Sequence, residues 1–178
     1  MSLNLPAGME INAPIKPGYE TILTADALAL VAKLHRAYEG IRQELLQARI
    51  DRQAAIDAGE MPDFLPETRN IREGDWSVSP LPKALERRRT EITGPVEAKM
   101  VINAFNSGAD SYMADFEDSN SPKWDNQIQG QVNLYKAIRH ELSFVNEAGK
   151  EYRLNDKVAT LQIRPRGWHL DEKHVTVD

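Results

Sequence analysis

Hydrophobic residues recur every three or four positions in three stretches of the chain, a spacing typical of amphipathic helices. The first stretch starts after Thr24, a favourable helix cap, and ends near Gly59. The second opens at Thr93-Gly94-Pro95 and ends at Asn106-Ser107-Gly108, and the third starts at Ser121-Pro122. We expect the apolar stripe of each helix to pack on a core. The stripe of the first helix consists of Leu28, Val31, His35, Tyr38, Ile41, Leu45 and Ala48.

Apolar runs without helical spacing predict strands over residues 110–116 and 158–164. Between them, residues 144–153 predict a hairpin in which Gly149 supplies a positive φ. The order helix, strand, helix, hairpin, strand is typical of βαβ units and therefore predicts a parallel sheet. Residues 171–174 are expected to begin a further helix.

Two segments lack periodicity. Residues 1–19 predict an irregular arm, and residues 61–82, rich in Pro, Gly and Asp, predict a long connector. The connector is expected to be pinned to a surface by its isolated apolar side chains, which are Phe64, Leu65, Ile71 and Trp76. We therefore predict two parts, residues 1–82 and residues 83–178. Two core strands cannot close a barrel, which takes eight, so the chain is expected to be truncated.

Composition narrows the class of protein. The chain has 178 residues, 28% of them charged, and a formal net charge of −5, which argues against a nucleic-acid partner. It has no cysteine, and this excludes disulfides and thiolate metal sites. No stretch approaches the roughly 20 apolar residues that span a membrane, and the N-terminus has no signal-peptide pattern. We expect a soluble, cytoplasmic protein.

Both predicted core strands end in charged residues. Asp115 and Glu117 share one face at the end of the first strand, where two carboxylates can converge on a divalent cation or on its waters. Residues 115–118 fit loop capping equally well. Arg164 ends the second strand on its polar face. Its guanidinium suits an anionic substrate or developing oxygen charge, and it also suits a structural ion pair with a neighbouring Asp.

A basic cluster, Arg87-Arg88-Arg89, precedes the second predicted helix. It is compatible with the phosphate groups of a cofactor. Because Glu86 and Glu91 flank it, the cluster is also typical of a solvated face. His169 and His174 are five residues apart, which does not match a two-histidine metal site on a helix, so we expect neither to be a ligand.

Several blocks together resemble malate synthase of the shorter A type, an enzyme family of the glyoxylate cycle. The resemblance is strong from about Pro62 to Val175 and looser over the first helix. The blocks are Leu85 with Arg88-Arg89, Glu91-Ile92-Thr93-Gly94-Pro95, Lys99-Met100-Val101-Ile102-Asn103-Ala104, Asn106-Ser107-Gly108-Ala109-Asp110, Met113-Ala114-Asp115-Phe116-Glu117-Asp118-Ser119, Arg164-Pro165-Arg166-Gly167-Trp168-His169-Leu170 and Glu172-Lys173-His174-Val175.

The resemblance implies an α/β fold. Residues 1–82 would form an N-terminal α-helical clasp, and residues 83–178 the first strands and helices of an incomplete TIM (β/α)8 barrel. It also implies a Mg²⁺-dependent condensation of acetyl-CoA with glyoxylate and water to give (S)-malate and CoA. In that reaction a carboxylate deprotonates the acetyl methyl group, the enolate attacks glyoxylate, and the malyl thioester is hydrolysed. The family's general base and direct Mg²⁺ ligands lie beyond this chain. We therefore expect a fragment, inactive alone, whose partner is the remainder of the same polypeptide.

The resemblance also implies roles for individual residues. Arg164 corresponds to the catalytic arginine that stabilises the developing oxygen charge. Asp115 and Glu117 correspond to an acidic pair near the metal, in its second shell or beside its bound waters. The residues that correspond to a region near the acetyl-CoA nucleotide are Arg88, Arg89 and Thr93.

Two other functions stay open from the sequence. One is a related metal-dependent acyl-CoA lyase, which would cleave rather than condense. The other is a stand-alone, non-enzymatic module that binds a partner through an unpaired strand edge. A peroxisomal or glyoxysomal location is also compatible with the sequence.

Overall fold

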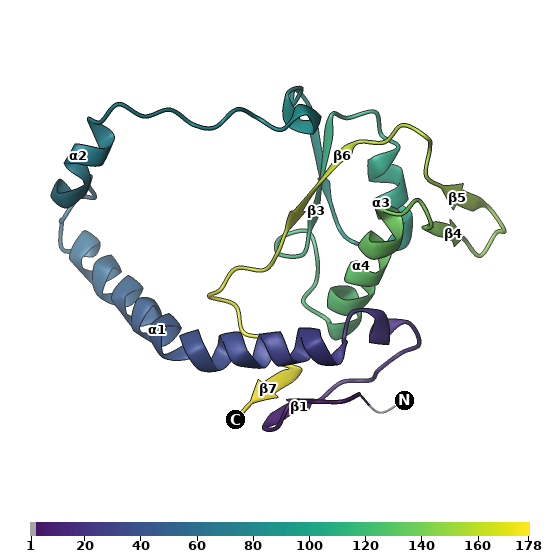
Figure 1. The fold of residues 1–178 in the computed structure, drawn as a ribbon, viewed down its shortest axis with the longest axis horizontal. Coiled ribbons are helices and arrows are strands. Elements are labelled where there is room, and N and C mark those ends of the chain that lie inside the picture. The colour runs from purple at the N-terminus through teal and green to yellow at the C-terminus, as the bar shows by residue number, and fades with distance from the viewer. Residues whose placement is uncertain (1–2) are drawn as a thin grey trace.

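The computed structural model describes residues 3–178, in which a long helix leads away from a small α/β unit (Figure 1). The helices are α1 (Ala25–Asp57), α2 (Arg69–Arg72), α3 (Ala98–Phe105) and α4 (Trp124–Ala137). Short 3₁₀ turns are η1 (Tyr19–Thr21), η2 (Pro66–Thr68) and η3 (Lys83–Leu85). The strands are β1 (Met9–Ile11), β2 (Glu91–Gly94), β3 (Ser111–Asp115), β4 (Ser143–Val145), β5 (Glu151–Arg153), β6 (Thr160–Arg164) and β7 (Val175–Val177).

The central sheet is parallel and has the strand order β2-β3-β6. The predicted parallel sheet is confirmed, but it has three strands rather than two. The sequence pattern assigned Thr93-Gly94-Pro95 to a helix start, whereas residues 91–94 pair with β3 and α3 begins only at Ala98. The β-branched side chains of Ile92 and Thr93 suit a strand, and Pro95 then ends the pairing.

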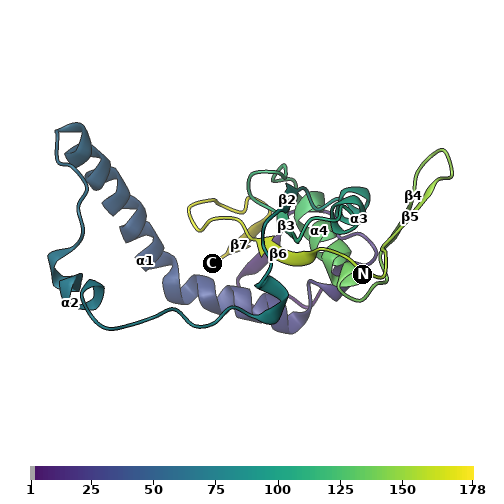
Figure 2. The same cartoon turned by 90° about the horizontal axis from the view of Figure 1, so that it is seen from above.

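Helices α3 and α4 cover one face of this sheet (Figure 2). Tyr112, Ala114 and Phe116 point into this layer, and the rings of Phe105 and Tyr112 meet edge to face at 5.4 Å. At Gly130, an added Cβ would lie only 2.3 Å from Val96 Cγ2. The missing side chain therefore lets α4 lie close to the loop after β2. The alternate residues of each strand point to the other face. Within residues 3–178 no α-helix covers that face, and only the 3₁₀ turn η3 reaches it, where Thr160 Oγ1 donates to the carbonyl of Ala84 at 3.1 Å.

A second core ties the two ends of the described chain together. Strand β1 pairs antiparallel with β7, and Trp124 on α4 donates from Nε1 to the carbonyl of Pro14 at 3.0 Å. Two predictions were wrong here, since the arm over residues 1–19 contains a strand and residues 171–174 begin no helix. Both errors arise from a pairing between segments about 165 residues apart, which no local pattern encodes. The boundary between residues 1–82 and 83–178 stays a prediction, although this core joins both parts. The core consists of Met9, Tyr19, Leu23, Leu28, Ala32, Trp124, Ile128 and Val132.

Helix α1 begins as predicted, with the Thr24 hydroxyl oxygen accepting from the backbone N–H of Ala27 at 3.2 Å. Its apolar stripe is not buried as expected, because only Leu28 and Ala32 on this helix are buried among the described residues. The far half of α1, together with α2 and the connector, arches away from the sheet (Figure 1). The connector side chains that were expected to act as anchors, Phe64, Leu65, Ile71 and Trp76, are exposed as well.

The predicted hairpin is confirmed. Strands β4 and β5 pair antiparallel, and Gly149 in the turn has φ 79°, which glycine adopts without strain. Over the described part of the chain, no helix combines the length and the apolar content that crossing a membrane requires.

Candidate functional site

Asp115 and Arg164 are register partners at the carboxyl ends of β3 and β6. Because paired residues of parallel strands share a face, both side chains lie on the sheet face opposite to α3 and α4. Thr93 pairs with Met113, two residues before Asp115, and so shares that face. The carboxyl ends of parallel strands are where α/β proteins place their ligand sites. The structure therefore brings the acidic and basic strand ends together at one edge of the sheet.

The Asp115 carboxylate is fully buried and accepts five hydrogen bonds. Arg164 donates two, from Nε at 2.9 Å and from Nη2 at 2.6 Å. The other three come from the backbone N–H groups of Glu117, Asp118 and Ser119. The hydrogen bonds from Arg164, helped by those from the loop, hold the pKa of Asp115 well below its usual range although burial opposes this. Asp115 therefore fixes both the loop and the arginine.

Two more carboxylates surround the same guanidinium. Asp118 Oδ2 lies 2.7 Å from Arg164 Nη2, and Glu117 Oε2 lies 3.7 Å from Arg164 Nε. Hydrogen bonding to Asp115 is the main cause that raises the pKa of Arg164 above its usual value. With three carboxylates around one guanidinium, the cluster carries a net charge of −2. Asp118 was not singled out from the sequence, although its position in the Asp-Phe-Glu-Asp stretch was visible.

Glu117 also holds the loop that follows β6. Its Oε1 accepts from the backbone N–H of Gly167 at 3.0 Å. An added Cβ at Gly167 would lie 2.7 Å from that carboxylate oxygen and 2.6 Å from the ring of His169. Arg166 turns away to Glu172, with 2.6 Å between Nη1 and Oε2. The two strand ends are therefore joined by Arg164 with Asp115 and by Glu117 with Gly167.

These carboxylates do not fit direct ligation of a metal ion. Asp115 has no exposed surface, and all of its contacts are N–H donors. One oxygen of Glu117 is engaged by Gly167 and the other faces a guanidinium. Within residues 3–178, no group of three or more His, Cys, Asp or Glu side chains is arranged to hold a metal ion. A role beside metal-bound waters stays a prediction for Asp115 and Glu117.

Two of the remaining predicted site residues lie near the other end of the sheet. Arg88 and Arg89 precede β2, and the backbone N–H of Arg89 donates to Asp110 Oδ2 at 2.9 Å. Arg164 lies four strand residues away from that end of the sheet, a distance of about 13 Å along the strand. Thr93 alone of the three predicted nucleotide contacts shares the face of Arg164. Their contact with acetyl-CoA stays a prediction.

A polar network that sequence reasoning missed lies on the same open face. Glu91 Oε2 accepts from Gln162 Nε2 at 2.9 Å and from Ser111 Oγ at 3.2 Å, so one carboxylate joins all three strands. The alternation of polar residues along β6 was the available signal. This network supports the sheet below the Arg164 cluster and has no contact with it in the described hydrogen bonds.

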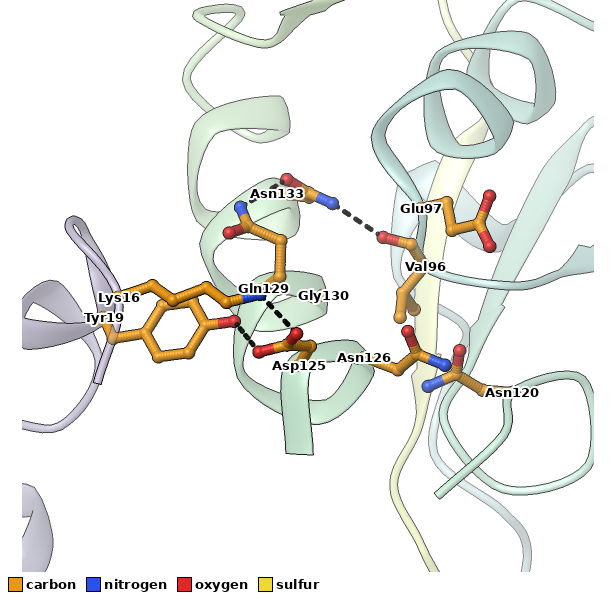
Figure 3. A pocket seen from close by; sticks show the side chains of 10 residues that line it. All are labelled: Lys16, Tyr19, Val96, Glu97, Asn120, Asp125, Asn126, Gln129, Gly130 and Asn133. Atoms are coloured by element: carbon orange, nitrogen blue, oxygen red, sulfur yellow. Dashed lines mark hydrogen bonds and ion pairs between the residues drawn. The ribbon is translucent and has the colours of Figure 1, made fainter. Parts of the chain in front are cut away.

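A separate polar hollow of about 150 Å³ lies between α4 and the N-terminal arm (Figure 3). Tyr19 donates to Asp125 Oδ1 at 2.8 Å, and Lys16 pairs with the other oxygen of that carboxylate. The buried Asn120 side-chain nitrogen has no hydrogen-bond partner within residues 3–178. The size and polarity of the hollow suit ordered water. It lies on the helix-covered side of the sheet, away from Arg164.

The fold and the site define a parallel α/β protein with a buried carboxylate–guanidinium pair at its strand ends. Residues 7–70 match the family model "Malate synthase, N-terminal domain". Over 171 residues, 96% of this chain and 32% of the relative, the chain is 54% identical to the malate synthase of Myxococcus xanthus (strain DK1622). It is 50% identical to the malate synthase of Oryza sativa subsp. japonica over 97% of this chain and 31% of the relative. It is also 51% identical to a protein of Candida tropicalis named "Malate synthase, glyoxysomal", over 96% of this chain and 32% of the relative.

The chain belongs to the malate synthase family and spans about a third of the length of the curated relatives it matches. The resemblance stated from the sequence motifs is thereby confirmed.

Proposed function

We propose that this chain is part of a malate synthase, which condenses acetyl-CoA with glyoxylate and water to give (S)-malate and CoA. The observation that carries the proposal is Arg164, held at a strand end by a buried carboxylate with part of its guanidinium still exposed. A fixed cation in such a position stabilises oxygen charge as it develops, because no reorganisation is needed at the moment of reaction.

In this proposal the residues of the chain have separate tasks. Arg164 donates to the oxygen that becomes negative, first on the enolate and then on the alkoxide. Asp115 keeps the guanidinium charged and fixed in direction, because two of its N–H groups are bound by one carboxylate. Glu117 keeps the Gly167 loop against the same strand end. The proton-abstracting carboxylate would come from outside these 178 residues.

The proposal includes Mg²⁺. The net charge of −2 on the Arg164 cluster repels an anionic substrate, and a divalent cation beside it would remove that repulsion. Because the described residues offer no direct ligand set, the direct ligands would come from outside this chain. Glu117 would then act through water bound to the ion.

We further propose that the three parallel strands begin a TIM barrel, with residues 1–82 as a helical clasp and residues 83–178 as the start of the catalytic domain. In support, no α-helix of residues 3–178 covers the sheet face that carries Asp115 and Arg164, as the inner face of a barrel requires. The apolar stripe of α1 is largely exposed in this chain, so it has surface left to bury. The 178 residues alone would then not turn over.

The acetyl-CoA nucleotide is proposed to lie near Arg88, Arg89 and Thr93. The support is chemical: cationic side chains suit its phosphates. No nucleic-acid or membrane partner is proposed, and the remainder of the polypeptide is the partner. A cytoplasmic location is proposed, with a glyoxysomal one as the alternative, since some relatives carry that word in their names.

The test is CoA release by the full-length protein that contains this sequence, compared with the 178-residue chain. The full-length protein is expected to release CoA only with acetyl-CoA, glyoxylate and Mg²⁺ together, and the short chain to release none. Malate must be the product. Cleavage of malyl-CoA without net condensation would indicate the acyl-CoA lyase instead.

One observation favours a non-enzymatic, partner-binding module, namely the open edges of the sheet at β2 and β6. That function predicts a monodisperse 20.1 kDa monomer that unfolds cooperatively and has no full-length counterpart in source cells. A native product of much higher mass, detected with an antibody against this chain, would exclude it.

A further inference from the structure

Arg164 presents two different edges of its guanidinium to carboxylates. The Nε–Nη2 edge is filled by both oxygens of Asp115, at 2.9 Å and 2.6 Å. The Nη1–Nη2 edge is only half filled, because Asp118 Oδ2 takes one N–H of Nη2 at 2.7 Å. A guanidinium has five N–H groups, and the two on Nη1 have no partner within residues 3–178. The Nη1–Nη2 edge can therefore receive two oxygens once Asp118 leaves it.

The two aspartates differ in how firmly they are held. Asp115 is fully buried and bound by five donors, so it cannot leave without exposing unpaired groups. The Asp118 side chain is 73% exposed, and its carboxylate contacts Arg164 alone among the described hydrogen bonds. An exposed single ion pair of this kind is weak and opens readily to water. Asp118 can thus exchange with a ligand, whereas Asp115 cannot.

The geometry points to Asp118 as a built-in competitor for the anion-binding edge of Arg164. We expect a small carboxylate or oxyanion to bind across Nη1 and Nη2, a geometry that suits two parallel N–H groups, and to displace Asp118 as it binds. Asp118 then lowers the affinity of the site for anions in general by occupying one N–H and by adding negative charge. The inference rests on the proposed function for the identity of the anion, which is glyoxylate.

The experiment is a titration of the 178-residue chain with sodium glyoxylate at constant ionic strength, without Mg²⁺ or acetyl-CoA. The Arg164 Nε–H resonance reports binding. The wild-type chain is compared with Asp118→Asn and Asp118→Ala, whose exposed position leaves the core intact. Asp156→Asn, which removes the same charge from an exposed loop, is the matched control.

Both Asp118 variants are expected to bind glyoxylate about three- to tenfold more tightly than the wild type, because an exposed pair and one nearby charge are removed. Asp156→Asn is expected to change the dissociation constant by less than about twofold, because salt screens distant charges. Unchanged affinity in both Asp118 variants would overturn the inference. So would the absence of any Arg164 shift in all four proteins.

A second readout separates this inference from the proposed reaction. In the full-length protein, Asp118→Asn is expected to lower KM for glyoxylate by about three- to tenfold, because ground-state competition is removed. If the full-length protein releases no CoA but the chain shows the tighter binding, the reaction proposal fails and the inference stands. If CoA is released and Asp118→Asn lowers kcat instead of KM, Asp118 has another role and the inference fails.

Discussion

The carboxylate of Asp115 and the guanidinium of Arg164 form a pair of parallel hydrogen bonds across adjacent strands, at 2.9 Å and 2.6 Å. The two residues are 49 positions apart and are register partners of β3 and β6. Because one partner is fully buried and also holds three backbone N–H groups, the pair fixes the direction in which the arginine presents its free N–H groups.

Arg164→Ala in the full-length protein is expected to reduce CoA release by about 10²- to 10³-fold, the loss typical of removing one donor to a developing oxyanion. Arg164→Lys keeps the charge but cannot bind two oxygens in parallel, so an intermediate loss is expected. Arg139→Ala serves as control, since Arg139 stacks on Tyr135 on the outer face of α4. A loss below about tenfold in Arg164→Ala would contradict the assigned role.

Asp115→Ala is expected to lower the free energy of unfolding of this chain by about 3 kcal/mol, because it leaves Arg164 and three loop N–H groups without their acceptor. Chemical denaturation measured by circular dichroism tests this. Asp156→Ala, at an exposed acid without a hydrogen bond among the described contacts, should stay within about 0.5 kcal/mol of the wild type. Equal stabilities for the two variants would mean that the Asp115 contacts are not maintained in solution.

The acid side of the stability curve depends on the same carboxylate. The pKa of Asp115 in the folded chain lies below its unfolded value of about 3.9, because Arg164 and the loop donate to the ionised form. The unfolded chain therefore binds more protons between these two pKa values, and stability falls as the pH falls from about 4 towards the folded pKa. In Asp115→Asn this fall should be shallower. Parallel curves for the two proteins below about pH 4 would refute this.

The alkaline side depends on Tyr19. Burial, with help from the hydrogen bond to Asp125, raises its pKa to about 12. The stability that this shift contributes is complete below the unfolded pKa of about 10, and it is lost as the pH rises through about 12. Tyr19→Phe should flatten the curve between about pH 10 and pH 12. Tyr38→Phe, at an exposed tyrosine of α1, is the control and should leave the curve unchanged.

Two helical glycines should respond in opposite directions to replacement by alanine. Gly130→Ala would bring a methyl group within 2.3 Å of Val96 and 2.8 Å of Phe116, so a loss of about 1–3 kcal/mol in unfolding free energy is expected. Gly40→Ala on α1 has nothing within 4 Å and should add about 0.5–1 kcal/mol, because alanine favours helix. Thermal denaturation of the two variants tests both expected changes in stability. A stabilised Gly130→Ala variant would show that α4 packs less closely than described.

Elements whose signals are local could be predicted from the sequence. The Thr24 cap and the start of α1, the strand before Asp115, the helix after Ser121-Pro122 and the Gly149 hairpin all follow from residues close together in the chain. Local propensity and capping suffice for these because their hydrogen bonds join near neighbours. The motifs also identified the family, since a motif needs no tertiary contact to be recognised.

Which distant segments meet could be read only from the folded chain. The pairing of β1 with β7, the third strand β2 and the exposure of the α1 stripe depend on contacts far apart in the sequence, and local periodicity does not report them. The same holds at the site. The alternation along two strands placed Asp115 and Arg164 on polar faces, but only the parallel register brought them into contact and left Asp118 on the remaining edge of the guanidinium. Register is a property of paired strands, so no single strand contains it.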